Sequence, residues 1–203
     1  MTTSSPGTGP SPVSVTPGQG TRTERLLLHP SEEADLPELH ALQSDPRVWG
    51  HLPSGRFVDA DETRSWLETQ RGRWRENGLD TWTVRDAQSG EFHGYGGCSL
   101  RGGPAEEARF WNLGYRLRPE VHGRGLATEL SRAAVARARG LRPEVPVVAY
   151  LLEHNGASAA VARKVGLELR HRAPDAGNPD PEAVRLVFSD RPLTAAQLAA
   201  TLA

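Results

Sequence analysis

Two glycines stand between an expected strand and an expected helix, in an arrangement that can bind an anion. The strand covers residues 112–117, Gly123 and Gly125 follow in the connection, and a helix begins directly after them. The backbone N–H groups of residues 123–127 have no partner within such a helix, and they carry the partial positive charge of its N-terminus. Arg124 adds a guanidinium to this cradle. The pattern suits a phosphate site, although the sequence lacks both the P-loop motif and the dinucleotide-binding glycine motif. Taken alone, a Gly-x-Gly turn before a helix is more often an ordinary tight connection.

The one cysteine of the chain does not suggest a nucleophile. Cys98 lies in the apolar run Tyr95–Leu100, which favours a small buried side chain in a strand. A single cysteine also allows no internal disulfide and no thiolate cluster for a metal. We therefore expect a cytoplasmic protein without a metal site.

The elements that must position these residues follow from hydrophobic periodicity and from helix-capping patterns. A capping box of Asp35 and Glu38 is expected to open a helix through about residue 43, and further expected helices cover about residues 59–77, 126–139 and 155–165. The capping pattern Thr194–Gln197 opens a short C-terminal helix. Expected strands cover residues 22–28, a hairpin around the turn 86–90, and residues 109–117, 145–152, 168–171 and 184–188. The strand 145–152 is continuously apolar, which is typical of a strand buried on both faces. This order favours a mixed sheet with helices on both faces.

Composition limits the partners that the protein can have. With 203 residues, 37% of them hydrophobic, the chain can form one complete core. A net charge of -1 argues against nucleic acid or an anionic membrane as the main partner. No apolar run is long enough to cross a bilayer, and no signal-peptide core is present. We expect a disordered Ser/Thr/Pro/Gly tail over residues 1–20 and a single domain over residues 21–203.

Three segments together resemble one known family. Residues 114–129 resemble the acetyl-CoA-binding motif of the GNAT superfamily, Gln/Arg-x-x-Gly-x-Gly/Ala. Residues 155–158 and 162–167 resemble its second signature, an Asn-x-x-Ser helix that ends in Lys-x-Gly-Phe. The opening residues 23–28 resemble the RimJ/RimL branch of that superfamily.

The resemblance implies an α/β (α+β) fold with a mixed, mostly antiparallel sheet that splays between its central strands. It implies acetyl-CoA, or another short acyl-CoA, as cosubstrate. The pantetheine arm would lie between the splayed central strands, which are residues 112–117 and 145–152. A primary amine would attack the thioester directly, without a covalent enzyme intermediate. A backbone N–H near Leu113 or Gly114 would stabilise the oxyanion.

The family motifs assign roles to particular residues. Those implied to bind the cofactor are Leu113, Tyr115, Leu117, His122, Gly123, Arg124, Gly125, Leu126, Ala127, Thr128, Asn155 and Ser158. Asn155 would hold the pantetheine, although an Asn here also has a structural reason as a helix cap. Ser158 would hydrogen-bond or protonate the leaving thiolate; the alternative is an idle surface hydroxyl. Lys164 would lie near the adenosine phosphate or only favour the helix C-terminus.

The acceptor side is less defined. Trp49, Trp66, Trp82 and Asn112 are the candidates for binding the substrate, although tryptophans belong to the core by default. Asn112 also departs from the family pattern, because many RimJ/RimL-like proteins carry there a Glu that acts as general base. An amide cannot accept the proton, so Glu153, His154, His51, Asp80 or solvent must do so. His122 is a second departure, since it stands where the family has Gln or Arg, and it binds phosphate in a pH-dependent way.

The sequence thus predicts an N-acetyltransferase whose acceptor is a protein N-terminus, an amino acid or an amine-bearing small molecule. The alternative, motivated by Asn112, is a catalytically weak or inactive acyl-CoA-binding sensor. A ribosomal or nucleic-acid role has only the branch name and the arginine content behind it, and the arginines are scattered among 25 acidic residues. Homodimers are common among such proteins, but no interface can be read from this sequence.

Overall fold

The computed structural model describes residues 20–50, 55–176 and 178–202. Almost the whole expected tail and His51 lie outside these ranges. The strands are β1 (Thr21–Arg22), β2 (Leu26–Pro30), β3 (Thr81–Asp86), β4 (Phe92–Arg101), β5 (Phe110–Leu117), β6 (Val147–Leu152), β7 (Glu168–Pro174) and β8 (Val184–Ser189). The helices are α1 (Leu36–Ser44), α2 (Ala60–Asn77), α3 (Leu126–Leu141), α4 (Gly156–Lys164) and α5 (Ala195–Leu202), with short 3-10 turns at Glu33–Asp35, Glu106–Ala108 and Pro119–Val121.

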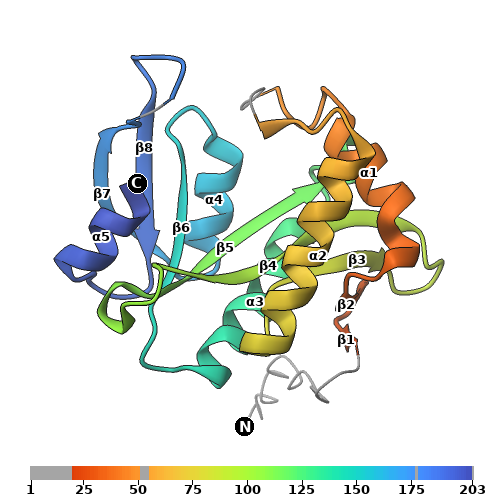
Figure 1. Cartoon of the computed structure of the whole chain (residues 1–203), viewed down its shortest axis with the longest axis horizontal. Helices are drawn as coiled ribbons and strands as arrows, with labels where there is room; N and C mark the ends of the chain where they lie inside the picture. The colour runs from red at the N-terminus through yellow and green to blue at the C-terminus, as the bar shows by residue number, and fades with distance from the viewer. Residues whose placement is uncertain (1–19, 51–54, 177, 203) are drawn as a thin grey trace, which may run out of the picture.

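All the strands belong to one sheet, which opens in its middle. The order is β1-β2-β3-β4-β5-β6-β8-β7, and every pair is antiparallel except β5 with β6. These two strands pair only through Trp111 with Val147 and Asn112 with Val148. Beyond that point they diverge, and α4 follows β6 on the far side of the opening (Figure 1). The expected mixed, mostly antiparallel sheet that splays between its central strands is confirmed.

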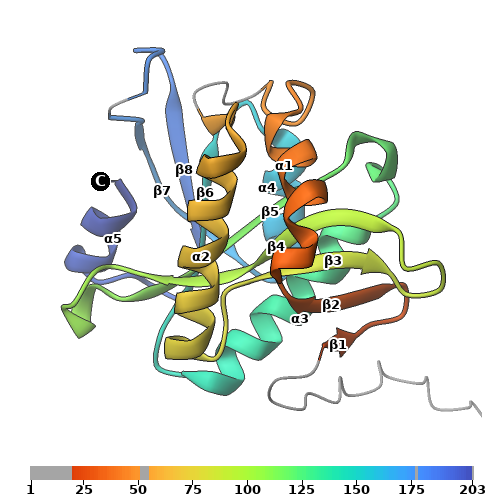
Figure 2. The same ribbon diagram turned by 45° about the vertical axis from the view of Figure 1, so that its right-hand side comes forward.

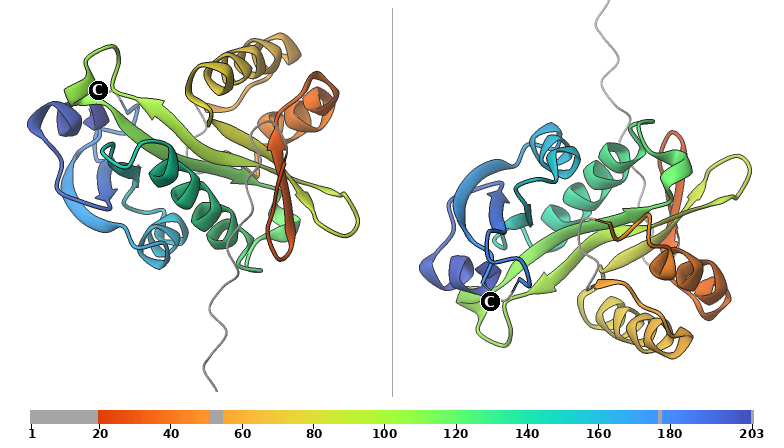
Figure 3. Two further views of the ribbon diagram at one scale, coloured as in Figure 1. Left: turned by 90° about the horizontal axis from the view of Figure 1, so that it is seen from below. Right: turned by 90° about the horizontal axis from the view of Figure 1, so that it is seen from above.

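Helices cover both faces of the sheet (Figure 3). On one face, α3 and α4 close the main core, whose largest fully buried side chains include Trp82, Trp111 and Phe188. On the other face, α1 and α2 lie side by side over β3 and β4 (Figure 2) and bury a second cluster that contains Trp49 and Tyr95. A third, smaller cluster lies under α5. None of the described helices is both long enough and apolar enough to cross a bilayer.

The helix α2 begins and ends where its sequence predicts. Asp59 caps it in a reciprocal capping box with Glu62, and Gly78 ends it in the left-handed conformation at φ 70°. The expected capping box of Asp35 and Glu38, by contrast, is wrong. The box joins Glu32 and Asp35, because the buried Asp35 carboxylate also binds Thr83 and Arg85 on β3. Asp35 therefore fastens the start of α1 to the sheet.

Other expected boundaries also change. The N-terminal strand is two strands, since Thr23 N–H bonds to the Leu26 carbonyl in a turn between β1 and β2. Helix α3 continues through Gly140 to Leu141. The strand β6 is buried on both faces only in its first half, and Tyr150 is 37% exposed. The reason is the sheet opening, because β5 no longer covers β6 beyond Val148.

Candidate active site

The glycine turn forms a cradle of backbone donors at the start of α3. Gly123 (φ 74°) and Gly125 (φ 80°) both take the left-handed conformation, which side chains with a Cβ rarely adopt. No acceptor among the described residues binds the N–H groups of residues 123–127. A cavity of about 470 Å³ adjoins this turn and continues along α4. The donors suit a phosphate group, which accepts hydrogen bonds and carries negative charge.

A clamp from the N-terminal segment holds this turn in place. Arg25 donates from Nε to Glu129 Oε2 at 2.7 Å and from Nη1 to the Arg124 carbonyl at 2.8 Å. The Thr23 hydroxyl donates to the same Glu129 carboxylate. Burial alone would raise the pKa of Glu129, but the hydrogen bonds from Thr23 and Arg25 outweigh it, so the pKa is lowered. Glu129 is therefore ionised at neutral pH and ties the start of α3 to the turn between β1 and β2.

The free edge of β5 supplies further backbone donors. Trp111 N–H donates to the Pro146 carbonyl at 2.9 Å, so the backbone groups of every second residue of β5 face β6. Past Asn112, the N–H groups of Leu113, Tyr115 and Leu117 therefore point into the opening. An extended amide-bearing chain could pair with this edge as an additional strand would.

Two carbonyls of this edge already accept side-chain hydrogen bonds. His122 Nε2 lies 2.9 Å from the Leu117 carbonyl, so that nitrogen carries the proton. Arg116 Nη1 donates to the Tyr115 carbonyl at 3.0 Å. His122 therefore has a local structural partner in addition to its place at the edge of the cavity.

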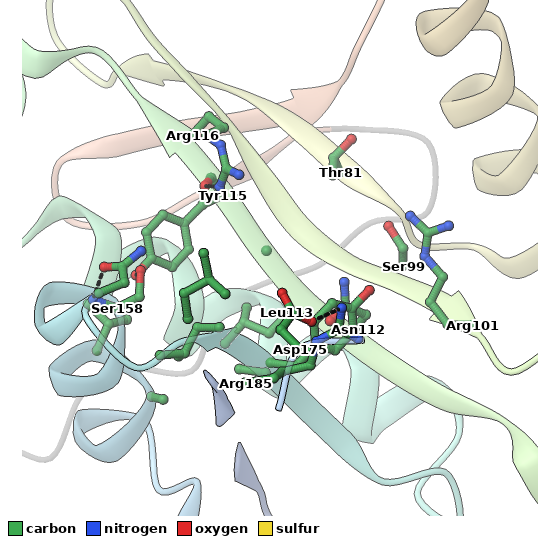
Figure 4. A pocket seen from close by; sticks show the side chains of 18 of the residues that line it. Thr81, Ser99, Arg101, Asn112, Leu113, Tyr115, Arg116, Ser158, Asp175 and Arg185 are labelled. Atoms are coloured by element: carbon green, nitrogen blue, oxygen red, sulfur yellow. Dashed lines mark hydrogen bonds and ion pairs between the residues drawn. The ribbon is translucent and has the colours of Figure 1, made fainter. Parts of the chain in front are cut away.

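A pair of hydroxyls stands where the first cavity meets a second one. Asn155 caps α4 through a 3.0 Å bond from Ser158 N–H to Asn155 Oδ1. The Tyr115 hydroxyl donates to Ser158 Oγ at 3.3 Å, and Figure 4 shows the Tyr115 ring reaching from β5 toward Ser158. All three residues line both cavities. Burial raises the pKa of Tyr115, which keeps its hydroxyl protonated and able to donate.

The second cavity, of about 500 Å³, opens on the α2 side of β4 and β5 and is called the acceptor cavity below. Gly114 lies in its floor, where an added Cβ would meet nothing within 4 Å. Ser99 and Asn112 are register partners on the neighbouring strands, and both line the cavity together with Trp66. The cavity therefore places polar groups around an open space beside the β5 edge (Figure 4).

A buried carboxylate lies behind Ser99. The Ser99 hydroxyl donates to Asp80 Oδ1 at 2.9 Å, and Thr81 N–H donates to the same oxygen at 2.7 Å. The other Asp80 oxygen is buried and has no hydrogen-bond partner among the described residues. The Gln70 amide, in the orientation that satisfies its neighbours, also donates to Asp80. Burial raises the pKa of Asp80, which makes its carboxylate a stronger base.

The structure brings most of the expected cofactor residues together. Lining residues of the two cavities include Leu113, Tyr115, Leu117, His122, Gly123, Gly125, Leu126, Ala127, Thr128, Asn155, Ser158 and Lys164. The Arg124 side chain is exposed and does not line these two cavities, so its backbone is the part that the turn presents.

Other expected site residues lie elsewhere. Trp82 is 2% exposed and packs in the main core beside Trp74, so it does not reach the acceptor cavity. Trp49 is buried under the Arg116 guanidinium, 4.5 Å from its ring centre. Glu153 and His154 are exposed and line neither cavity. Glu153 binds Arg172 through two hydrogen bonds, and this interaction lowers the pKa of Glu153 and weakens it as a base.

Several polar residues of the site have no sequence signal of their own. The Tyr115 hydroxyl, Ser99 and Arg101 come together only through strand register and the sheet opening.

Burial raises the pKa of Cys98 far above its ordinary range, which keeps this thiol protonated. Among the described residues, no group of three His, Cys, Asp or Glu side chains could hold a metal ion.

The structure combines a sheet that splits between β5 and β6 with a cavity at the N-terminus of α3, where backbone donors are unpaired. Residues 25–168 match the family model described as "Acetyltransferase (GNAT) domain". The chain therefore belongs to the GNAT acetyltransferase family.

Individual proteins resemble this chain in sequence or in fold. The uncharacterized protein YkkB of Bacillus subtilis (strain 168) is 29% identical over 146 residues, which are 71% of this chain and 83% of YkkB. A putative GnaT-family acetyltransferase from Bordetella pertussis superposes with a TM-score of 0.71 at 23% identity, covering 85% of this chain and 99% of that one. RimL, a ribosomal L7/L12 alpha-N-protein acetyltransferase solved with coenzyme A, superposes with a TM-score of 0.66 at 19% identity, over 86% and 97%.

Proposed function

We propose that this protein is an acetyl-CoA-dependent N-acetyltransferase that moves the acetyl group to a primary amine by direct attack on the thioester. One observation carries the proposal: two adjoining cavities share Tyr115, Asn155 and Ser158 among their lining residues, at the place where the sheet opens. One cavity has a phosphate cradle, and the other has polar groups on an open floor. A thioester held in the first can therefore meet an amine held in the second.

Successive parts of the cosubstrate would meet successive residues along this opening. The N–H groups of residues 123–127 would bind the pyrophosphate, and those of Tyr115 and Leu117 would pair with the pantetheine amides. The N–H of Leu113 faces the opening and would stabilise the oxyanion, whereas that of Gly114 faces β4. Coenzyme A in the RimL structure supports the choice of ligand. The acetyl group, rather than another short acyl group, remains part of the proposal.

The reaction forms a C–N bond between the amine and the acetyl carbon and breaks the C–S bond of the thioester. Ser158, hydrogen-bonded by the Tyr115 hydroxyl, delivers a proton to the departing sulfur. The proton lost from nitrogen passes to Ser99 and from there to Asp80. This path supplies the base that Asn112 cannot, and of the base candidates in the described ranges Asp80 has the most suitable contacts.

The finer assignments belong to the same proposal. The Thr23–Arg25 segment supports membership of the RimJ/RimL branch. The side chains of this segment hold the phosphate cradle. A cytoplasmic location and a homodimer stay predictions of the sequence.

Steady release of coenzyme A in a panel of primary amines tests the proposal. We expect turnover with at least one amine, and the Ser158→Ala variant should lower kcat by roughly tenfold to a hundredfold, in the range of lost acid catalysis. Ser65→Ala on the exposed side of α2 is the matched control and should keep full activity. Tight acetyl-CoA binding without turnover on any amine, and no effect of Ser158→Ala, would instead support the sensor function.

A further inference from the structure

The charged side chains that line the acceptor cavity are mostly cationic. They are Arg101, Arg116 and Arg185 with one acid, Asp175, whereas the whole chain has a net charge of -1. Arg185 is neutralised by its ion pair with Asp175 and also donates to the Thr201 carbonyl. Arg116 stacks on Trp49 and bonds to the Tyr115 carbonyl. Arg101 is left as the lining cation without a hydrogen bond or ion pair to any described residue.

Arg101 is enclosed as well as unpartnered. It is the last residue of β4, it is half-buried, and its Nε is a buried atom without a hydrogen-bond partner among the described residues. Burial of this Nε without a partner is costly, because the hydration that it loses is not replaced. A bound carboxylate or phosphate would replace it, since both match the planar fork of Arg.

The surroundings of Arg101 favour an anion further. Arg73 of α2 is half-buried, and its pKa is lowered first by burial and then by the repulsion of Arg101. Asp80 acts on both arginines and Glu76 acts on Arg73, but burial raises the pKa of Asp80, and one Asp80 oxygen already accepts from Ser99 and Thr81. Arg101 thus has a cation beside it and no ion pair of its own with a described acid.

Asn112 offers the complementary group for an amine. Its Oδ1 is buried and has no described partner, and an amide oxygen accepts hydrogen bonds from N–H donors. Ser99, Arg101 and Asn112 lie at one end of the acceptor cavity, with Tyr115 and Ser158 at the other (Figure 4). Ser99 and Arg101 are two residues apart on β4, which separates their Cα atoms by roughly 7 Å. One small molecule can therefore reach Asn112 with an amine and Arg101 with an anionic group.

We propose that the acceptor is a small amine that also carries an oxyanion, a carboxylate or a phosphate, and that Arg101 binds this oxyanion. The proposal rests on the function proposed above for the same cavity. The cavity volume of about 500 Å³ suits a small molecule. Arg101 thereby becomes the residue that selects the acceptor.

Matched amines test this selection. Beta-alanine is compared with beta-alaninamide, and O-phosphoethanolamine with ethanolamine, so that each pair differs chiefly in the anion. We expect kcat/KM to favour at least one anionic member by roughly tenfold to a hundredfold, the usual effect of a charge-assisted hydrogen bond. The pair with the larger ratio identifies carboxylate or phosphate as the preferred group. Arg101→Gln should remove the preference, because it should lower kcat/KM for the anionic amines far more than for their neutral partners, and it should leave the KM for acetyl-CoA unchanged.

Two further variants separate charge from structure. Arg101→Lys keeps the charge and should retain part of the preference, which also tests the proposal if Arg101→Gln folds poorly. Arg75→Gln, on the exposed end of α2, is the matched control and should leave the preference intact. Equal rates within both pairs, or an equal loss on all four amines in Arg101→Gln, would overturn the proposal.

Calorimetry with the same amines, in the presence of coenzyme A, distinguishes this proposal from the proposed function. Binding of an anionic amine that depends on Arg101, without turnover, would support the anion site and contradict the enzymatic function. Turnover of neutral and anionic amines alike would support the enzyme and contradict the anion site. Neither binding nor turnover of any anionic amine would contradict the anion site as well.

Discussion

At the scale of single residues, Asp80 can supply the base that Asn112 cannot be. Asn112 was expected to bind the substrate rather than to take its proton, and its amide oxygen can only accept a hydrogen bond. Asp80, one of the bases that the sequence offered, lies directly before β3 and reaches the acceptor cavity through the Ser99 hydroxyl at 2.9 Å. A carboxylate that is buried behind a serine can replace one that is missing from the neighbouring strand.

This arrangement predicts a particular pH dependence. The Asp80 carboxylate accepts a proton only above its pKa, so kcat/KM should fall as the pH decreases through that pKa, which burial raises above the ordinary 3.8. Asp80→Asn should remove this acid limb and lower kcat by roughly tenfold to a hundredfold. Ser99→Ala should do the same without changing the buried charge. An acid limb that persists unchanged in both variants would show that another group takes the proton.

At the scale of elements, the phosphate cradle depends on a contact with the N-terminal part of the chain. The turn between β1 and β2 supplies Thr23 and Arg25, and both bind Glu129 in the first turn of α3. Arg25 also bonds to the Arg124 carbonyl inside the turn itself. The left-handed glycines permit the turn, and this clamp selects its orientation.

Removal of the clamp should weaken cofactor binding more than chemistry. Arg25→Ala frees the Arg124 carbonyl and leaves Glu129 partly buried without its ion pair. We expect the KM for acetyl-CoA to rise by roughly fivefold to tenfold, the range of one ordinary net hydrogen bond, because Arg25 orients the turn from a largely exposed position. The value of kcat should change little, because Arg25 lies away from the hydroxyl pair. Arg22→Ala on β1, which is exposed, serves as the control. A fall in kcat with an unchanged KM would contradict this role.

At the scale of the whole molecule, the two halves of the sheet are joined by only two residue pairs between β5 and β6. The remaining backbone donors of β5 and those of the α3 turn lie along one continuous path from the acceptor cavity to the phosphate cradle. A long ligand would accept hydrogen bonds from both groups of donors, those of β5 and those of the α3 turn. The two groups can be followed separately.

Backbone hydrogen exchange can follow the two parts separately. Coenzyme A should slow exchange of the amides of Leu113, Tyr115 and residues 123–127, because the ligand would accept their hydrogen bonds. Pantetheine, which lacks the pyrophosphate, should protect Leu113 and Tyr115 and leave residues 123–127 unchanged. Exchange within α5 should be the same in all states, since α5 lies outside both cavities. Protection of α5 together with the site, or of residues 123–127 by pantetheine, would argue against this path.

The local sequence determined much of this protein. Asp59 and Gly78 mark the two ends of α2, and Gly123 and Gly125 mark the turn before α3, because caps and left-handed turns are interactions between residues close in the chain. The order of strands and helices and the residues of the cofactor cradle could therefore be predicted from the motifs alone.

Only the tertiary structure decided which polar groups surround the acceptor. Ser99 faces Asn112 through strand register, Asp80 lies behind Ser99, and Trp82 turns into the core instead of the cavity. Strand register and burial depend on contacts between residues that are distant in the sequence, and no local pattern records them. The partial exposure of the second half of β6 could not be predicted locally either. It depends on where β5 and β6 separate, and the packing of the whole sheet sets that point.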